Sequence, residues 1–291
     1  MDSAKVNGVE LEYEVVGSGE PVLLSSPAVP RGFVPLLSQP ALADRYQLIR
    51  YHRRGWAGSA HTLPPVSIAD HAADAGGLLD HLGVRRAHVA GHSNSGPVVL
   101  QLALDRPEVV HTLTLLEPAL FTVPSADAFF KNAGPSLEAY GAGDHERAVA
   151  GFLSAVSGLD WETCQAVIDE HVPGGIAQTV KDADTLFGIE LPAISAWAFG
   201  PEQAAAIGQP VLSVLGSETV PLFAEGRPLL HSWFPQVEDC TIEGVGHLLH
   251  IQRPQPVAQA MAEFLAWNPV RPHRHTPGRV TSLVGGRGPR G

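Results

Sequence analysis

The stretch Val89-Ala90-Gly91-His92-Ser93-Asn94-Ser95-Gly96-Pro97 decides how this chain is expected to fold. The apolar residues 87–90 before it predict a short buried strand, and residues 98–104 after it predict a helix. A strand, a sharp turn and a helix are the setting in which a G-x-S-x-G sequence presents a serine hydroxyl at the top of a sheet. Ser95 stands where that pattern has its second glycine, so the match is to small residues. The alternative is an ordinary strand-to-helix turn with a capping serine.

Length and composition are those of an ordinary globular protein. The 291 residues are 44% hydrophobic and 17% charged, which suits one large domain or one domain with an insertion. The net charge of −11 argues against nucleic acid, and no apolar run is long enough to span a membrane. The N-terminus lacks a signal-peptide pattern, and Cys164 and Cys240 are too far apart to suggest a metal site or a disulfide framework. We therefore expect a cytoplasmic protein that takes a small-molecule substrate and needs no metal or cofactor; its oligomeric state is open.

Strand and helix patterns alternate along most of the chain. The Asn7-Gly8 turn predicts an opening β-hairpin at a sheet edge. The predicted strands cover residues 9–16, 22–25, 46–51, 87–90, 111–117, 210–216 and 237–242, and the predicted helices cover 33–43, 67–82, 98–104, 227–234 and 256–267. This alternation predicts an α/β protein with a mostly parallel sheet that is covered by helices on both faces.

The pattern changes between residues 124 and 206, where only helices are predicted, over 127–140, 145–157, 161–171 and 176–187. This stretch holds twelve acidic and three basic residues, a local charge of −9, which we attribute to a solvated outer helix surface. We expect it to be a helical cap inserted into a core made of residues 1–123 and 207–267. Residues 268–291 carry five arginines and no acidic residue, and we expect this tail to be disordered, with a phosphate-binding arm as the alternative.

Several spaced motifs, taken in order, resemble those of the α/β-hydrolase superfamily. They are the loop Leu24-Ser25-Ser26-Pro27-Ala28, the stretch Tyr51-His52-Arg53-Arg54-Gly55-Trp56-Ala57-Gly58-Ser59, the Ser93 turn, and Gly246-His247 before the last helix. The second of these is similar to the family's Y-D-x-R-G-x-G-x-S. The resemblance covers about residues 5–267 and implies an α/β-hydrolase fold with an inserted helical cap.

The resemblance implies a nucleophile, an acid and a histidine in that order along the chain. Ser93 is then the nucleophile, and it needs a base within hydrogen-bond reach. His247 lies where the family has that base, and His250 is its nearest rival. Most of the remaining histidines are expected to have no catalytic role. We assign His52, His61, His71 and His81 to loops and helix surfaces.

The position of the acid departs from the commonest family pattern, which is G-x-x-D after the strand at 210–216. Thr219 stands where that aspartate is expected, directly after Glu218. Glu117 ends the apolar strand at 111–117, and a buried carboxylate without a partner is costly. Some relatives, including many haloalkane dehalogenases and certain lactonases, carry their acid at this strand end. We predict Glu117 as the acid, with Glu218 as the alternative and a structural salt bridge or cap as the non-catalytic explanation.

Two backbone N–H groups are expected to bind the oxyanion of the reaction. One belongs to Asn94, directly after the nucleophile, and the other to the loop after the first buried strand. Most relatives have His-Gly in that loop, whereas this chain has Ser26-Pro27-Ala28, and proline has no N–H. We therefore predict Ala28 as the second donor, with Val29 as a fallback.

The leading functional hypothesis is a serine hydrolase that cleaves a carboxylic ester or lactone through an acyl-enzyme. A serine at this turn argues against haloalkane dehalogenases and epoxide hydrolases, which use aspartate there. Three departures from the family pattern occur together: the chain has no His-Gly in the first loop, a glutamate at the end of the earlier strand, and no aspartate after the later strand. This combination resembles lactonases of the zearalenone-hydrolase type. The alternatives are C–C bond hydrolysis of a diketone-like substrate, a cofactor-free perhydrolase or haloperoxidase, and a degenerate hydrolase fold that acts as a ligand receptor. Phe121 and Trp197 are predicted to line the substrate pocket, with core packing as the alternative for each.

Overall fold

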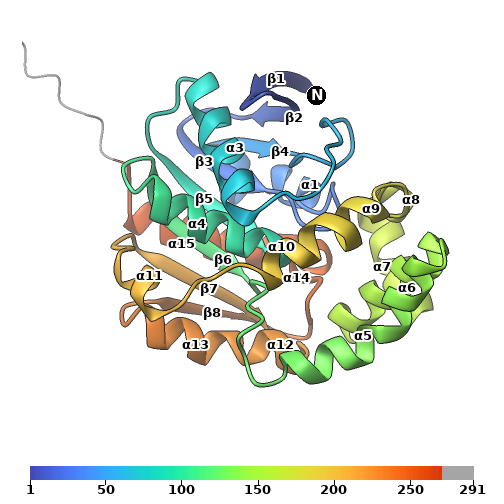
Figure 1. The fold of residues 1–291 in the computed structure, drawn as a ribbon. Coiled ribbons are helices and arrows are strands. Elements are labelled where there is room, and N and C mark those ends of the chain that lie inside the picture. The colour runs from blue at the N-terminus through green and yellow to red at the C-terminus, as the bar shows by residue number, and fades with distance from the viewer. Residues whose placement is uncertain (271–291) are drawn as a thin grey trace, which may run out of the picture.

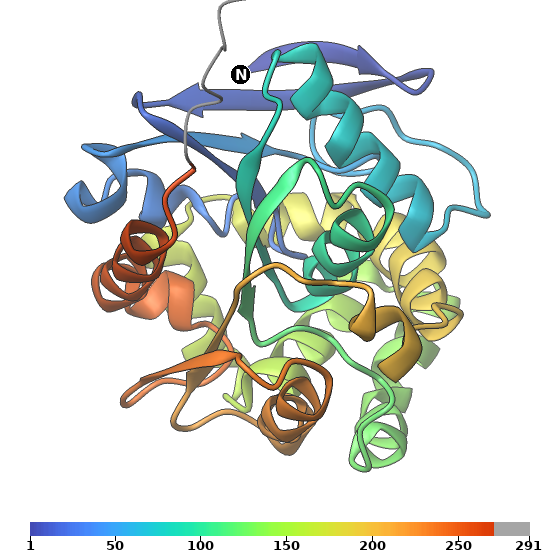
Figure 2. The same cartoon turned by 90° about the vertical axis from the view of Figure 1, so that its left-hand side faces the viewer.

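A computed structural model describes residues 1–270, and these form one twisted eight-stranded sheet with helices on both faces (Figures 1 and 2). The strands are β1 (Asp2–Val6), β2 (Val9–Val16), β3 (Glu20–Ser25), β4 (Tyr46–Tyr51), β5 (Ala87–His92), β6 (Val110–Leu116), β7 (Val211–Gly216) and β8 (Glu238–Ile242). Their order across the sheet is β1-β2-β4-β3-β5-β6-β7-β8. The pairs β1–β2 and β2–β4 are antiparallel and the other five pairs are parallel, so the predicted mostly parallel α/β sheet is confirmed.

The opening hairpin joins β1 and β2 at one edge of the sheet, as the sequence predicts. Asn7 and Gly8 have φ angles of 48° and 80°, the positive values that a two-residue hairpin turn of this hand requires. The strands in the middle of the sheet, β5 and β6, are buried along almost their whole length because helices cover both faces of the sheet.

The helices outside the insertion form two layers, one on each face of the sheet. They are α1 (Val34–Leu37), α2 (Pro40–Ala43), α3 (Ile68–His81), α4 (Gly96–Asp105), α12 (Pro221–Ala224), α13 (Gly226–Trp233), α14 (Leu249–Gln252) and α15 (Pro254–Trp267). Residues of α3, α4 and α13 form one apolar core with the sheet, and residues of α1, α2 and α15 form another (Figure 2). The helix predicted over 33–43 is in fact two short helices, because Pro40 starts the second one.

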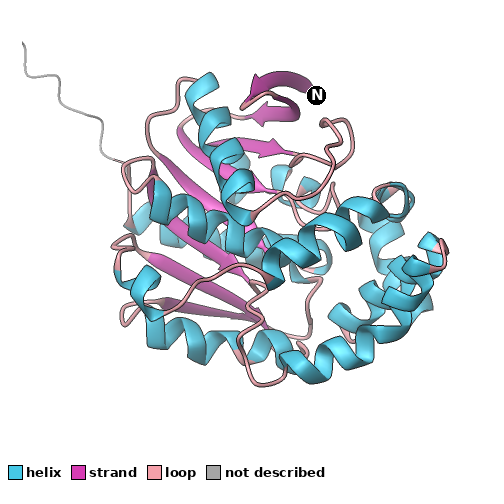
Figure 3. Ribbon diagram, viewed as in Figure 1, coloured by secondary structure: helices cyan, strands magenta, loops and turns pink. Residues whose placement is uncertain are grey.

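Between β6 and β7 the chain forms only helices (Figure 3). They are α5 (Ala126–Gly141), α6 (His145–Ser157), α7 (Trp161–His171), α8 (Gly175–Lys181), α9 (Ala183–Thr185), a π-helical turn (Leu186–Glu190), α10 (Leu191–Ser195) and α11 (Pro201–Ala205). We refer to residues 126–205 as the inserted helical segment. The first three helices match the prediction closely.

The prediction of one helix over 176–187 is wrong. The helix stops at Lys181 because the next residue, Asp182, is buried and accepts a hydrogen bond from the backbone of Ala57 in the core. After that break the chain continues through the π-helical turn to Ser195, and the proline at 192 is tolerated because it falls in the first turn of α10.

Residues 271–291, which make up most of the predicted disordered tail, lie outside the described residues. Within the described part of the chain, no helix combines the length and the apolar character that crossing a membrane requires. Cys164 and Cys240 are both free thiols.

Candidate functional site

Ser93 sits at a sharp turn between β5 and α4. Its φ is +55°, in the left-handed region that non-glycine residues rarely adopt. A side chain at Gly91 would come within 2.6 Å of the Ser95 carbonyl oxygen, and one at Gly96 would collide with Pro118. The turn therefore needs glycine at both of these positions.

Ser95 fits where the usual pattern has a glycine because its φ is −88°, which any residue can adopt. Its hydroxyl accepts from the His92 N–H at 2.9 Å and donates to the Ser25 carbonyl at 2.7 Å. The departure from G-x-S-x-G thus adds two hydrogen bonds to the turn, one of them to the neighbouring strand β3.

His247 and Glu117 form a buried hydrogen-bonded pair. The distance from His247 Nδ1 to Glu117 Oε2 is 2.7 Å, and the two side chains are 3% and 0% exposed. Glu117 follows directly after β6 with a φ of +43°. Of the four non-glycine residues between 1 and 270 with positive φ, two are therefore Ser93 and Glu117, and such strained backbone gathers at functional sites.

The loop after β7 holds the Glu117 carboxylate in place. The Gly216 N–H donates to Oε1 at 2.8 Å, and the Thr219 hydroxyl donates to Oε2 at 2.7 Å. Thr219, which stands where the family usually has its acid, instead donates to a carboxylate at the end of the adjacent strand. Glu218, the alternative acid, is exposed, and no contact with His247 is found for it in the described part of the chain.

The environment of the pair favours the protonation state that a general base needs. Burial lowers the pKa of His247, so the imidazole is neutral at neutral pH. Burial raises the pKa of Glu117, and the hydrogen bonds from Gly216 and Thr219 oppose that rise. With the ring proton on Nδ1, facing the carboxylate, Nε2 is the free acceptor. The His247 ring is further held by stacking on Phe223, with centroids 3.7 Å apart.

Two more histidines pack around His247. His92 Nε2 donates to the backbone carbonyl oxygen of His247 at 2.9 Å. His250 packs against His92, with ring centroids 4.0 Å apart and ring planes tilted by 42°, and neither of its ring nitrogens has a hydrogen-bond partner among residues 1–270. Burial lowers the pKa of both rings, which therefore add no charge to the site.

Ser93, His247 and Ala28 line one small, mostly apolar cavity of about 20 Å³. Its roof is α6, through Phe152, Leu153 and Val156. The volume suits about one water molecule, so a substrate needs the roof to move or its side chains to rearrange. The Ala28 N–H donates no hydrogen bond to any residue in the described part of the chain, which leaves it free for a ligand.

Phe121 and Trp197, which we predicted to line the substrate pocket, do not line the cavity beside Ser93. The Trp197 indole N–H donates to Gln101 in α4 at 2.8 Å, and its ring stacks on Phe199, which ties it into the core. Phe121 packs against Phe130 with centroids 4.7 Å apart. Neither side chain borders the cavity beside Ser93.

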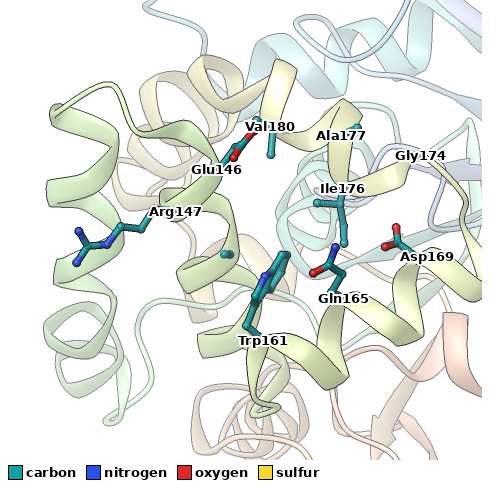
Figure 4. A pocket seen from close by; sticks show the side chains of 10 residues that line it. Glu146, Arg147, Trp161, Gln165, Asp169, Gly174, Ile176, Ala177 and Val180 are labelled. Atoms are coloured by element: carbon teal, nitrogen blue, oxygen red, sulfur yellow. The ribbon is translucent and has the colours of Figure 1, made fainter.

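A much larger hollow of about 710 Å³ lies between α6, α7 and α8 (Figure 4). Trp161, Gln165 and Ile176 line it, and the Arg147 side chain points away from them. Its lining includes none of the residues predicted for the functional site, so this hollow is separate from the Ser93 cavity.

Sequence reasoning missed two buried residues next to the Ser93 turn, Arg53 and Glu190. They are 1% and 2% exposed and form an ion pair, and Glu190 also contacts the Asn94 side chain. We predicted that the acidic residues of this segment lie on a solvated helix surface. That prediction is wrong for Glu190 and for Asp182, which is 1% exposed. Glu190 interrupts an apolar run, Ile189-Glu190-Leu191, and this is the same signal that pointed to Glu117.

The prediction that four histidines lie in loops or on helix surfaces is also partly wrong. His52 and His71 are 2% and 1% exposed, whereas His61 and His81 are exposed as expected. His52 is buried because it pairs with Glu12, with its Nδ1 2.7 Å from Oε2.

Comparison with known proteins identifies the family. The family model described as the alpha/beta hydrolase fold matches residues 23–254. The chain belongs to the α/β-hydrolase fold family. The match extends from β3 to the start of α15, so it includes Ser93, Glu117 and His247 of this α/β-hydrolase.

Among curated relatives, this α/β-hydrolase is 38% identical over 116 residues to "Putative carbamate hydrolase RutD" of Azorhizobium caulinodans, which covers 40% of the chain and 44% of that protein. The matched stretches span less than half the length of the curated relatives. Among solved structures, Est816, described as an N-acyl homoserine lactone degrading enzyme, superposes with a TM-score of 0.68 at 25% identity, over 90% of this chain and 100% of that one. The enol-lactonase from Burkholderia xenovorans superposes with a TM-score of 0.71 at 21% identity, over 91% of this chain and 100% of that one. At this identity the likeness shows the fold alone. The family and the names of these relatives support a hydrolase.

Proposed function

We propose that this α/β-hydrolase is a serine hydrolase that cleaves a carboxylic ester or a lactone through an acyl-enzyme. The observation that carries the proposal is the 2.7 Å hydrogen bond between His247 Nδ1 and Glu117 Oε2 beside the cavity that Ser93 and His247 share. A neutral, oriented imidazole next to a serine at a strained turn is the arrangement that activates a hydroxyl nucleophile.

In the proposed reaction, Ser93 Oγ attacks the carbonyl carbon of the substrate while His247 Nε2 takes its proton. Glu117 holds the imidazole and stabilises the imidazolium that forms. The N–H groups of Asn94 and Ala28 bind the oxyanion of the tetrahedral intermediate. The bond to the alkoxy leaving group then breaks, and that oxygen receives the proton from His247. In the second half of the reaction His247 takes a proton from a water molecule whose oxygen attacks the acyl carbon. The bond from that carbon to Ser93 Oγ then breaks, and Oγ receives the proton from His247.

Two observations support an apolar ester or a lactone as the substrate. The cavity beside Ser93 is walled by Phe152, Leu153 and Val156, which suit an apolar acyl chain. Est816, at 25% identity, acts on an N-acyl homoserine lactone according to its description. We propose that the inserted helical segment acts as a cap and selects the substrate through α6. A cytoplasmic location stays part of this proposal, because both cysteines are free.

The test is covalent labelling with a fluorophosphonate, followed by activity assays on a panel of p-nitrophenyl esters, lactones and vinylogous diketones. We expect labelling of the native chain, no labelling of Ser93→Ala, and turnover of esters or lactones. Labelling with turnover only of diketones would favour C–C hydrolysis, and peroxide-dependent turnover would favour a perhydrolase. A chain that neither labels nor turns over any substrate would be a ligand receptor.

A further inference from the structure

A buried carboxylate from the inserted helical segment joins the two loops on which the oxyanion donors lie. Glu190, at the end of the π-helical turn, is 2% exposed. Its Oε1 accepts from Arg53 Nε at 2.8 Å and from Trp56 Nε1 at 2.7 Å. Its Oε2 accepts from the side-chain amide of Asn94. Glu190 therefore holds the residue whose backbone N–H is proposed to face the oxyanion.

The same network reaches the second oxyanion loop. Arg53 is 1% exposed, and its Nη1 donates to the carbonyl oxygen of Ser26, two residues before Ala28. The hydroxyl of Thr179, in α8, donates to the carbonyl oxygen of Ala28 itself at 3.3 Å. Both loops that supply the proposed donors are thus tied to the inserted helical segment.

Fold stability alone does not account for this arrangement. A buried ion pair such as Arg53–Glu190 is often no more stabilising than apolar side chains of the same volume, because both charges lose their hydration. What the network does provide is a fixed position for two backbone segments. Oxyanion donors act only when they lie about 2.7–3.1 Å from the developing charge, so small displacements are costly.

We infer that Glu190 is a positioning residue that holds the Asn94 and Ala28 backbones in the geometry of an oxyanion hole. The inference rests on the proposed function and adds to it a residue of the inserted helical segment. It makes the assembly of the site depend on docking of that segment, since Glu190 hydrogen-bonds to the core through Arg53, Trp56 and Asn94.

The experiment compares Glu190→Ala, Asn94→Ala and the double variant on the best ester of the panel. Asn94→Ala keeps the backbone N–H and removes only the tether to Glu190. Each single variant should lower kcat by about tenfold to a hundredfold, with KM changed by less than about threefold. The double variant should lose little more than either single one, because both remove the same tether. Glu190→Gln should recover most of the rate, because its amide oxygen can accept from Arg53 and its NH₂ can donate to a rotated Asn94 amide.

A second readout separates positioning from a merely structural role. Phenylboronic acid forms a tetrahedral adduct on an active-site serine, and its inhibition constant should rise in parallel with the loss of kcat/KM. Asp182→Ala is the matched control, since Asp182 is equally buried in the same segment and bonds to Ala57, which belongs to neither oxyanion loop. It should keep kcat within about twofold and leave the inhibition constant unchanged.

The inference is overturned if Asp182→Ala loses as much kcat as Glu190→Ala, or if boronic acid binds Glu190→Ala and Asn94→Ala as tightly as the native chain. If Glu190→Ala does not fold, Asn94→Ala and Glu190→Gln decide the outcome. A native chain that is not labelled at Ser93 and hydrolyses no ester would instead refute the proposed function, and the positioning role with it.

Discussion

The assignment of Glu117 as the catalytic acid makes the sharpest prediction, and Glu117→Gln is the change that tests it. One carboxylate oxygen accepts the Gly216 N–H and the other accepts both Thr219 and His247. A glutamine keeps its oxygen toward Gly216 and so turns its NH₂ toward His247. Two donors then face each other, and His247 must move its proton to Nε2, where it can no longer accept the proton of Ser93.

The expected loss in kcat is on the order of 10⁴, as for the analogous amide substitution in serine-protease triads. That factor corresponds to about 5.5 kcal/mol of transition-state stabilisation. Because the substituted side chain has the same shape and does not itself line the cavity, KM should change by less than about threefold. Steady-state hydrolysis of a p-nitrophenyl ester measures both quantities, and far-ultraviolet circular dichroism checks the fold.

Glu218→Gln is the matched control, because it makes the same chemical change on the exposed alternative acid. It should keep kcat within about twofold. A Glu117→Gln enzyme that keeps most of its kcat, or a Glu218→Gln enzyme that loses it, would refute the reasoning. Thr219→Asp in the Glu117→Gln background should regain part of the lost rate, because the new carboxylate enters from the loop on which the family usually carries its acid.

Three further predictions concern the pocket, the core and the response to pH. Phe152→Ala should widen the cavity and raise kcat/KM for decanoate relative to acetate p-nitrophenyl esters by about tenfold, whereas Phe129→Ala, away from the cavity, should not change that ratio. Asp74→Asn breaks a buried bidentate pair with Arg54 (2.7 Å for each contact) and should lower the free energy of unfolding in urea by about 3 kcal/mol; a loss below about 1 kcal/mol would contradict this. Burial lowers the pKa of His71 from 6.5 to about 3, so the unfolded chain binds the extra proton and stability falls as pH drops through that range. His71→Leu should reduce the stability lost between about pH 7 and about pH 5 by about 2 kcal/mol, and an unchanged loss would count against it.

Local patterns in the sequence were enough to predict the sheet and the Ser93 turn. Parallel strands buried on both faces are mostly apolar, and the glycines at 91 and 96 mark positions where a side chain has no room. Glu117 could be singled out because a carboxylate at the end of a buried strand needs a partner. The structure brings it to His247, while its catalytic role stays a prediction.

Contacts that depend on how the inserted helical segment docks could not be predicted in the same way. Arg53 and Glu190 are far apart in the sequence, and nothing local indicates that they meet. The cavity wall comes from Phe152 rather than from Phe121 or Trp197. The buried residues of α6 recur at helical spacing, but that spacing does not tell which part of the core this face packs on. The break at Asp182 arises for the same reason, since its partner is a backbone N–H of the core.

The most direct test of the central claim is intact-protein mass spectrometry of the native chain, acid-quenched during turnover of a p-nitrophenyl ester. A covalent acyl-enzyme on Ser93 predicts a mass increase of one acyl group, located by peptide mapping to the tryptic peptide that contains Ser93 and absent from Ser93→Ala. An adduct on another residue, or ester hydrolysis that persists in Ser93→Ala without any adduct, would contradict it.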